Sequence, residues 1–299
     1  MSAAPSIALI GFGEVGQILA ADLRAGGAGA LSAWDLKFRD PSSPLRARAL
    51  DAGFRVAANA IEVVAGASIV ISAVTAGECT AAARSVAAGI AAGCVYLDLN
   101  SVAPRTKGEA ADSIAAQCGR YVEAAVMSPI LPRRIAAPIL LGGPHAEAFL
   151  PVARSLGFAG TEVFSDVLGR ASAAKMCRSV MVKGIESLLT ESLLAARRYG
   201  VEDAVLGSLN AMLPVGDWPK LARYMISRSL QHGTRRAEEM REVARAVADA
   251  GLDPLMSAAC AERQDWAAAY GAMAGEESLA PLLDAMLARI PAAPGGPTR

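Results

Sequence analysis

Hydrophobic positions follow two different patterns along this chain. In the first half, short apolar runs alternate with longer segments rich in Ala, Arg and Glu. Such runs are typical of strands buried on both faces, and the segments between them are typical of helices. Strands that alternate with helices predict parallel βαβ units in a sheet covered on both faces. The clearest predicted strands are 7–10, 31–34, 69–72, 95–99 and 121–126, and 139–141 and 162–164 are further candidates.

In the second half, apolar residues recur at helical spacing. From Arg170 to Tyr199 there is no proline, which predicts one long helix that stops at Gly200. We therefore expect an α/β domain over 1–168, an all-α domain over 169–290 joined to it by this long interdomain helix, and a disordered tail over 291–299. Further helices are predicted over 204–213, 218–231, 235–250, 254–270 and 279–290.

Composition narrows the class of protein. With 299 residues, the chain exceeds what one compact core usually holds, which agrees with two domains. Hydrophobic residues make up 53%, yet no uninterrupted apolar stretch reaches the about 20 residues that a membrane span needs. Lys plus Arg and Asp plus Glu both number 29, so there is no net positive charge to attract nucleic acid. We expect neither membrane nor nucleic acid as a partner.

Cysteine and histidine usage bears on compartment and metals. The 5 cysteines are scattered without a C-x-x-C pair, which favours free thiols in a reducing compartment over disulfides or a zinc site. The 2 histidines are too few for a metal site with histidine ligands. The chain start shows no signal-peptide pattern. The expectation is a cytoplasmic protein without a metal.

The stretch "ALIGFGEVG" carries the first candidate chemistry. Its glycines, Gly11, Gly13 and Gly16, follow a predicted strand and open a predicted helix, and Asp35 comes about twenty residues later. In a dinucleotide-binding Rossmann domain, the first glycine permits a tight turn, the second lets the backbone approach the pyrophosphate, and the third allows close helix packing. The helix start then offers N–H groups to phosphates. Candidate cofactor contacts are Gly11, Phe12, Gly13, Glu14, Val15, Gly16, Asp35, Val74, Thr75 and Asn100.

The choice between the two nicotinamide cofactors depends on the end of the second strand. Asp35 can accept hydrogen bonds from the adenosine ribose, which favours NAD. Lys37 and Arg39 follow closely, and a cation there can accommodate the 2′-phosphate of NADP. NAD is favoured and NADP stays open.

Three later segments, taken together with the glycine motif, carry a resemblance to a known family. They are "LDLNSVAP" (97–104), "YVEAAVMSPI" (121–130) and "GRASAAKMCRSVMVKG" (169–184). In this order, they resemble the β-hydroxyacid dehydrogenases, a group that includes 3-hydroxyisobutyrate and 6-phosphogluconate dehydrogenases. The resemblance covers nearly the whole chain and is nearest to a branch called phosphogluconate dehydrogenase-like, which has its own C-terminal helical domain. It implies NAD(P)-dependent hydride transfer on a hydroxy acid, and a homodimer formed through the helical domain.

The resemblance also implies individual roles. The family's D-x-x-S-x-x-P pattern matches Asp98, Ser101 and Pro104, which places Asn100 and Ser101 beside the nicotinamide and the substrate. A turn capped by Ser101 is the structural alternative. The catalytic lysine of the family corresponds to Lys175. A lysine suits this reaction because carbonyl–alcohol interconversion needs a proton donor or acceptor at the oxygen.

Two departures from the family concern the substrate. Ser179 stands where relatives have asparagine, and the neighbouring Arg178 offers a guanidinium that can bind a carboxylate. The substrate loop, usually D-A-P-V-S-G-G, reads E-A-A-V-M-S-P here: Met127 adds bulk beside Ser128, and Pro129 lacks an N–H. A substrate with an apolar portion, touching Met127 and Ile130, is therefore favoured. Alternatively, Arg133 and Arg134 in the next loop hold an anionic group.

His232 completes the list of candidate substrate contacts, with a structural role at a helix end as its alternative. Two other functions remain open. An imine reductase shares the architecture, but that group generally carries an acid or a tyrosine in place of Lys175. A dinucleotide-binding redox sensor without turnover would be consistent with Ser179 and the altered substrate loop.

Overall fold

The computed structural model describes residues 5–291, so the predicted tail lies, apart from Pro291, outside the described residues. The chain forms two compact units, Met1–Met176 and Cys177–Arg299. The boundary falls inside the long helix α7 (Arg170–Tyr199). Within the described range, no helix combines the length and hydrophobicity that crossing a membrane requires.

The N-terminal unit is built on one sheet with the strand order β3-β2-β1-β4-β5-β6-β7-β8. Neighbouring strands are parallel, except that β7 runs antiparallel to β6. This is a doubly wound Rossmann-type sheet, and the predicted fold class is confirmed. The strands are β1 (Ile7–Ile10), β2 (Leu31–Trp34), β3 (Arg55–Val56), β4 (Ile69–Ser72), β5 (Val95–Asp98), β6 (Arg120–Val126), β7 (Ile139–Gly142) and β8 (Thr161–Ser165).

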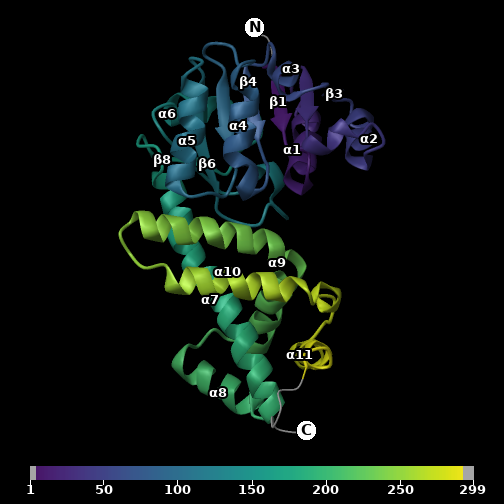
Figure 1. Ribbon diagram of the computed structural model, residues 1–299, viewed down its shortest axis with the longest axis vertical. Helices are drawn as coiled ribbons and strands as arrows, with labels where there is room; N and C mark the ends of the chain where they lie inside the picture. Colours follow the sequence, from purple (N-terminus) through teal and green to yellow (C-terminus); the bar gives the residue numbers. More distant parts are fainter. Residues whose placement is uncertain (1–4, 292–299) are drawn as a thin grey trace. The chain divides into compact units, whose positions relative to one another are not determined.

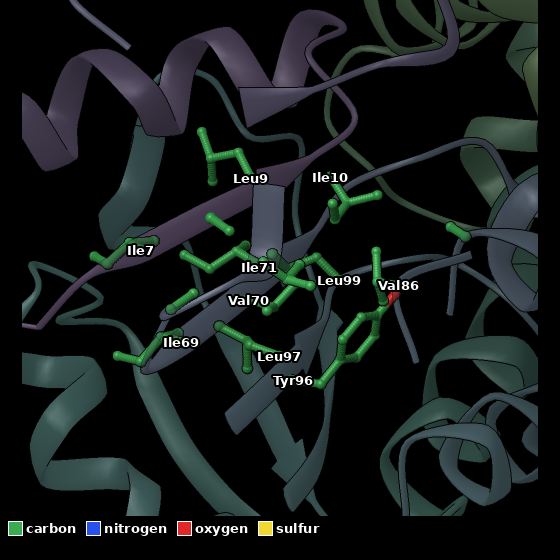
Figure 2. Close-up of a cluster of buried hydrophobic side chains, with 14 of the residues drawn as sticks. Ile7, Leu9, Ile10, Ile69, Val70, Ile71, Val86, Tyr96, Leu97 and Leu99 are labelled. Carbon is green, nitrogen blue, oxygen red and sulfur yellow. The ribbon is translucent and has the colours of Figure 1, made fainter. Parts of the chain in front are cut away.

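Helices connect these strands, and in Figure 1 α4 and α5 lie over the sheet on the viewer's side. The central strands are apolar on both faces because both are covered. Figure 2 shows Leu9, Ile71 and Leu97 from β1, β4 and β5 in the resulting core, and all three are buried. The helices are α1 (Glu14–Ala25), α2 (Pro44–Asp51), α3 (Ala60–Val64), α4 (Cys79–Ala87), α5 (Pro104–Ala115) and α6 (Ala146–Ser155), with 3-10 turns η1 (Leu36–Arg39), η2 (Ala76–Glu78) and η3 (Arg134–Ala136).

The strand order places three loops side by side. The chain leaves β1 toward β2 on one side and returns to β4 on the other, so the order reverses at β1. Ile10, Ser72 and Asp98 are paired in register at the carboxyl ends of β1, β4 and β5. Ligands of open α/β sheets bind at this edge, beside the reversal.

The C-terminal unit is helical. It contains the remainder of α7 and α8 (Glu202–Met212), α9 (Trp218–Asp249), α10 (Leu255–Ala268), η4 (Gly271–Met273) and α11 (Leu279–Leu287). Its own apolar core includes Leu193, Ile226 and Leu282, each fully buried or nearly so. Helices α9 and α10 pack closely at Gly233, where a Cβ would lie 2.4 Å from the carbonyl oxygen of Gln264. Only glycine fits this backbone approach.

The structure corrects two details of the sequence prediction. Strand β3 was not predicted, because a strand of two residues is too short to show a recognisable hydrophobic pattern. The pairing of β6 with β7 is antiparallel although parallel units were expected. The helices predicted over 218–231 and 235–250 both lie within α9, where a kink at His232 (φ −129°, ψ 17°) separates two helical segments, as the prediction had it.

Candidate active site

The glycine loop between β1 and α1 has three glycines with different surroundings. Gly11 has φ +91°, and a Cβ there would lie 2.4 Å from the carbonyl oxygen of Ala73. A Cβ on Gly16 would lie 2.2 Å from the carbonyl oxygen of Gly11, so the helix packs directly onto the turn. A Cβ on Gly13 would meet no atom within 4 Å. Gly11 and Gly16 therefore serve the fold, whereas Gly13 borders open space at the start of α1, which suits a pyrophosphate.

Asp35 anchors this loop to the second strand. One carboxylate oxygen accepts a hydrogen bond from the backbone N–H of Phe12 at 2.8 Å, and the other accepts from the N–H of Lys37 at 2.9 Å. The Phe12 ring is buried against Phe38 and Phe54. Asp35 is thus a structural residue of the loop, and its remaining lone pairs are available to a ribose. Lys37 and Arg39 are exposed, and the structure does not choose between NAD and NADP.

Asn100 joins the loops that follow β4 and β5. Its side-chain oxygen accepts a hydrogen bond from the N–H of Val74 at 2.7 Å, and its amide nitrogen donates to the hydroxyl of Ser72 at 3.0 Å. The side chain is buried. Asn100 therefore shapes the floor of the candidate cofactor site, with Val74 half-buried and Thr75 exposed beside it.

Below Asn100 lies a buried polar network centred on Asp98. The ammonium group of Lys107 forms an ion pair with the Asp98 carboxylate at 3.0 Å, and both side chains are almost fully buried. The phenol of Tyr121 also donates to this carboxylate, and so does the thiol of Cys79 at 3.3 Å. Burial and the nearby Asp98 charge raise the pKa of Cys79 to about 12. The network fixes the position of the Asp98 side chain. Its carboxylate in turn accepts a hydrogen bond from the backbone N–H of Asn100 at 2.8 Å.

Lys175 meets Ser101 at the end of β5. Its ammonium group donates a hydrogen bond to the Ser101 hydroxyl, and both side chains are half-buried. Lys175 lies in the second turn of α7 and belongs, like Ser101, to the N-terminal unit. The fold therefore brings together the two residues that the family resemblance singled out. An ammonium group and a hydroxyl at a parallel-strand terminus can deliver a proton to a substrate oxygen.

The altered substrate loop follows β6. Met127 and Ser128 are half-buried, and the N–H of Met127 donates to the carbonyl oxygen of Pro138 at 2.8 Å. The Ser128 hydroxyl donates to the carbonyl oxygen of Pro129. Arg134 forms an ion pair with Asp22 of α1 at 2.7 Å, so it fastens the loop to that helix. This contact speaks against Arg134 as the holder of an anionic substrate group.

The other predicted substrate contacts belong to the helical unit. Ser179 is buried, and Arg178 is exposed. His232 marks the kink of α9. Across residues 5–291, the structure gathers no three His, Cys, Asp or Glu side chains that would hold a metal ion.

The helical unit also holds buried charges that the sequence analysis did not single out. The Glu186 carboxylate accepts hydrogen bonds from Arg236 at 2.6 Å and from Gln264 at 3.3 Å. Burial raises the pKa of Glu186. Burial, together with the positive charge of Arg236, lowers the pKa of Arg228.

Sequence reasoning also missed two buried charges of the N-terminal unit, Lys107 and Glu123. Lys107 pairs with Asp98, and Glu123 accepts hydrogen bonds at the start of α7. The available signal for Glu123 was a charged residue inside an otherwise apolar strand, since such a group requires partners when buried.

Comparison with known proteins finds relatives for both parts of the chain. Residues 6–169 match the family model described as the NAD binding domain of 6-phosphogluconate dehydrogenase, and residues 196–267 match a domain of unknown function (DUF1932). A conserved hypothetical protein from Sinorhizobium meliloti 1021 is 37% identical, with 97% of this chain and 98% of that chain covered and a TM-score of 0.74.

Two further relatives are connected with hydroxyacid dehydrogenases. The conserved protein MTH1747, whose function is unknown and whose structure is described as similar to 3-hydroxyacid dehydrogenases, is 32% identical (94% of this chain and 98% of that chain, TM-score 0.68). The 3-hydroxyisobutyrate dehydrogenase of Pseudomonas aeruginosa is 26% identical over 218 residues, which are 71% of each chain.

The fold, the glycine loop and the first family match define an NAD(P)-binding oxidoreductase. The chain belongs to the β-hydroxyacid dehydrogenase family, in the branch whose C-terminal domain is the DUF1932 domain.

Proposed function

We propose that this protein catalyses NAD(P)-dependent hydride transfer on a hydroxy acid or a related alcohol or carbonyl compound, with Lys175 as the general acid and base. The observation that carries the proposal is the hydrogen bond from Lys175 to Ser101. It lies at the carboxyl end of β5, two strands from β1 and its glycine loop.

The N-terminal unit fits the nicotinamide cofactor that this function requires. Gly13 leaves space at the first turn of α1, where N–H groups and the helix dipole favour a pyrophosphate. Asp35 would accept hydrogen bonds from the adenosine ribose, which favours NAD over NADP. The bound cofactor supplies the hydride or accepts it.

The chain's own residues would manage the proton. During reduction, the Lys175 ammonium group donates a proton to the carbonyl oxygen as that oxygen gains negative charge, and in oxidation the neutral amine takes the hydroxyl proton. Ser101 accepts a hydrogen bond from Lys175 and so fixes the direction of the ammonium group. Its own O–H remains free to rotate toward the substrate oxygen.

The proposed substrate contacts come from the loop after β6 and from two helices. Met127 and Ser128 follow β6, whereas Ser179 comes one helical turn after Lys175 on α7 and so shares its helix face. Met127 favours a substrate with an apolar portion. Arg178 is the proposed contact for a carboxylate, and His232 is a further proposed substrate contact.

Assembly and compartment complete the proposal. The helical unit exposes several large apolar side chains. We propose that these side chains form a homodimer interface. A light-scattering measurement that gives the mass of a single chain would contradict this proposal. The exposed side chains include Met181, Leu188, Leu252, Leu255 and Met256. All 5 cysteines are unpaired, two of them exposed, which is consistent with the reducing cytoplasm.

A substrate panel tests the proposed function. Purified protein is mixed with NAD or NADP and hydroxy acids, and with the reduced cofactors and aldehydes or cyclic imines, while nicotinamide absorbance is followed. Turnover of a hydroxy acid or its carbonyl form supports the proposal. Turnover of imines alone would indicate an imine reductase, and cofactor binding without any turnover would indicate a redox sensor.

A further inference from the structure

Glu123 of β6 is a fully buried carboxylate at the start of the helix that carries Lys175. One of its oxygens accepts hydrogen bonds from the backbone N–H groups of Gly169 and Ala171, both at 3.0 Å. The other oxygen accepts from the hydroxyl of Ser172 at 3.1 Å. Its donors are two peptide groups and a hydroxyl rather than a cation. This arrangement gives the carboxylate the partners that burial requires.

The surrounding backbone leaves room for this carboxylate. Glu123 is paired in register with Gly142 of β7, and a Cβ on Gly142 would lie 2.2 Å from the Glu123 oxygen Oε1. Gly169, which donates one hydrogen bond, has φ +92° and turns the chain into α7. Any side chain at 142 would displace the carboxylate, so the contact is built into the sheet.

The same contact fixes the helix face on which Lys175 lies. Ala171 and Ser172 belong to the first turn of α7, and Lys175 follows them by four and three positions, so it is their neighbour on the helix surface. The carboxylate also lies at the positive end of the α7 dipole, where a negative charge is favourable.

We propose that Glu123 is a positioning residue for Lys175: it fastens the first turn of α7 to β6, and its negative charge favours the protonated form of the lysine. This inference rests on the proposed function of Lys175. A helix held at one end by three hydrogen bonds keeps the ammonium group in reach of Ser101. A negative charge held at the first turn of the same helix makes loss of the lysine proton less favourable.

The variant Glu123→Gln removes the negative charge of the side chain while it keeps nearly the same size and shape. Glutamine retains an acceptor for the N–H groups of Gly169 and Ala171, and its amide can donate to the Ser172 oxygen. In the variant, we expect kcat to fall about tenfold to a hundredfold while KM for the cofactor stays unchanged. The pH profile of kcat/KM should move toward lower pH by about one unit.

A readout that does not depend on turnover is the pH dependence of Lys175 acylation by acetic anhydride, measured by peptide mass spectrometry on the full-length protein. The exposed Lys37 and Lys220 serve as internal references. The midpoint of Lys175 labelling should fall in Glu123→Gln. Glu123→Asp, which keeps the charge with a shorter reach, should restore this midpoint but not kcat.

Asp22→Asn is the matched control. Asp22 is also a carboxylate that accepts hydrogen bonds from a backbone N–H (Ile135) and a side chain (Arg134), but it fastens a different loop. It should leave the labelling midpoint of Lys175 unchanged.

The outcomes separate this inference from the proposed function. A labelling midpoint that is the same in Glu123→Gln and the unmodified protein would overturn the role of Glu123, whatever the activity. Loss of turnover in Lys175→Gln would leave the proposed function standing in that case. If Glu123→Gln does not fold, Glu123→Asp and Ser172→Ala supply the test: an unchanged kcat in both would also overturn the inference.

Discussion

Lys175 and Ser101 are 74 positions apart in the sequence and hydrogen-bonded in the fold. Ser101 lies in the loop after β5. The hydrogen bonds of the buried Asp98 and Asn100 fix the conformation of this loop. Lys175 is held by α7, whose first turn is tied to Glu123. The contact therefore depends on two separate buried polar anchors. Substitutions in each anchor, and in the glycine loop between β1 and α1, should have measurable effects.

Substitution of Gly13 and of Gly16 by alanine should have opposite effects. Gly13→Ala adds a methyl group to open space, so stability should stay unchanged while affinity for NAD(P) falls about tenfold or more. Gly16→Ala pushes a methyl group against the Gly11 carbonyl oxygen and should cost about 1–3 kcal/mol of stability. Urea unfolding and cofactor titration check both. Equal losses of stability in the two variants would contradict this division of roles.

Asp35→Ser should change cofactor preference. The carboxylate suits the ribose hydroxyls of NAD and repels the 2′-phosphate of NADP, so its removal should shift the ratio of the two dissociation constants toward NADP by about tenfold. Fluorescence titration of NADH and NADPH measures this ratio. Lys37→Ser, at an exposed neighbouring position, provides the comparison. An unchanged ratio in Asp35→Ser would show that Asp35 acts on the loop alone, through Phe12.

Lys107→Met should be strongly destabilising. It leaves the Asp98 carboxylate buried without its cation, which costs about 3–5 kcal/mol. The double variant Lys107→Met with Asp98→Asn removes both charges and should recover part of the loss. Denaturant unfolding of the two variants measures the difference. A double variant less stable than Lys107→Met alone would contradict the ion-pair account.

Alkaline stability should depend on Cys79. Burial raises the pKa of this thiol from 9.0 to about 12, so between these values the unfolded chain releases a proton that the folded chain retains. Stability is therefore fully present below pH 9 and falls as pH rises, by about 1.4 kcal/mol per pH unit from this group. The stability of Cys79→Ala should fall less steeply over this range, because the raised pKa values of Tyr96 and Tyr121 affect both proteins. Parallel curves would contradict the assignment.

The sequence indicated much of the fold because its signals are local. The apolar runs at β1, β4 and β5 and the glycine spacing after β1 are properties of neighbouring residues. The family resemblance then named Ser101 and Lys175, whose contact depends on strand order and cannot be read from spacing. The strand at 139–141 was predicted, but its antiparallel direction was missed, because strand direction is set by the connection rather than by the strand's own residues.

The buried polar anchors were harder to predict. Lys107 is in a helix with charged neighbours and gives no sign in sequence that it is almost fully buried. Glu123 stood out only as a charge in an apolar strand, and its donors come from 46 to 49 positions away. Asp35 was predicted for the ribose, and its hydrogen bond to the Phe12 N–H was not foreseen. Such contacts arise from tertiary packing. The pattern of a single sequence does not show which distant residues will lie next to each other.

The most direct test of the central claim is single-turnover hydride transfer by Lys175→Ala and the unmodified protein, with a substrate identified in the panel and saturating cofactor. The account predicts that nicotinamide absorbance changes at least about a hundredfold more slowly in the variant, while cofactor affinity stays the same. Added small primary amines should restore part of the rate, because they can replace the missing proton donor. Hydride transfer at an unchanged rate in Lys175→Ala would contradict the account.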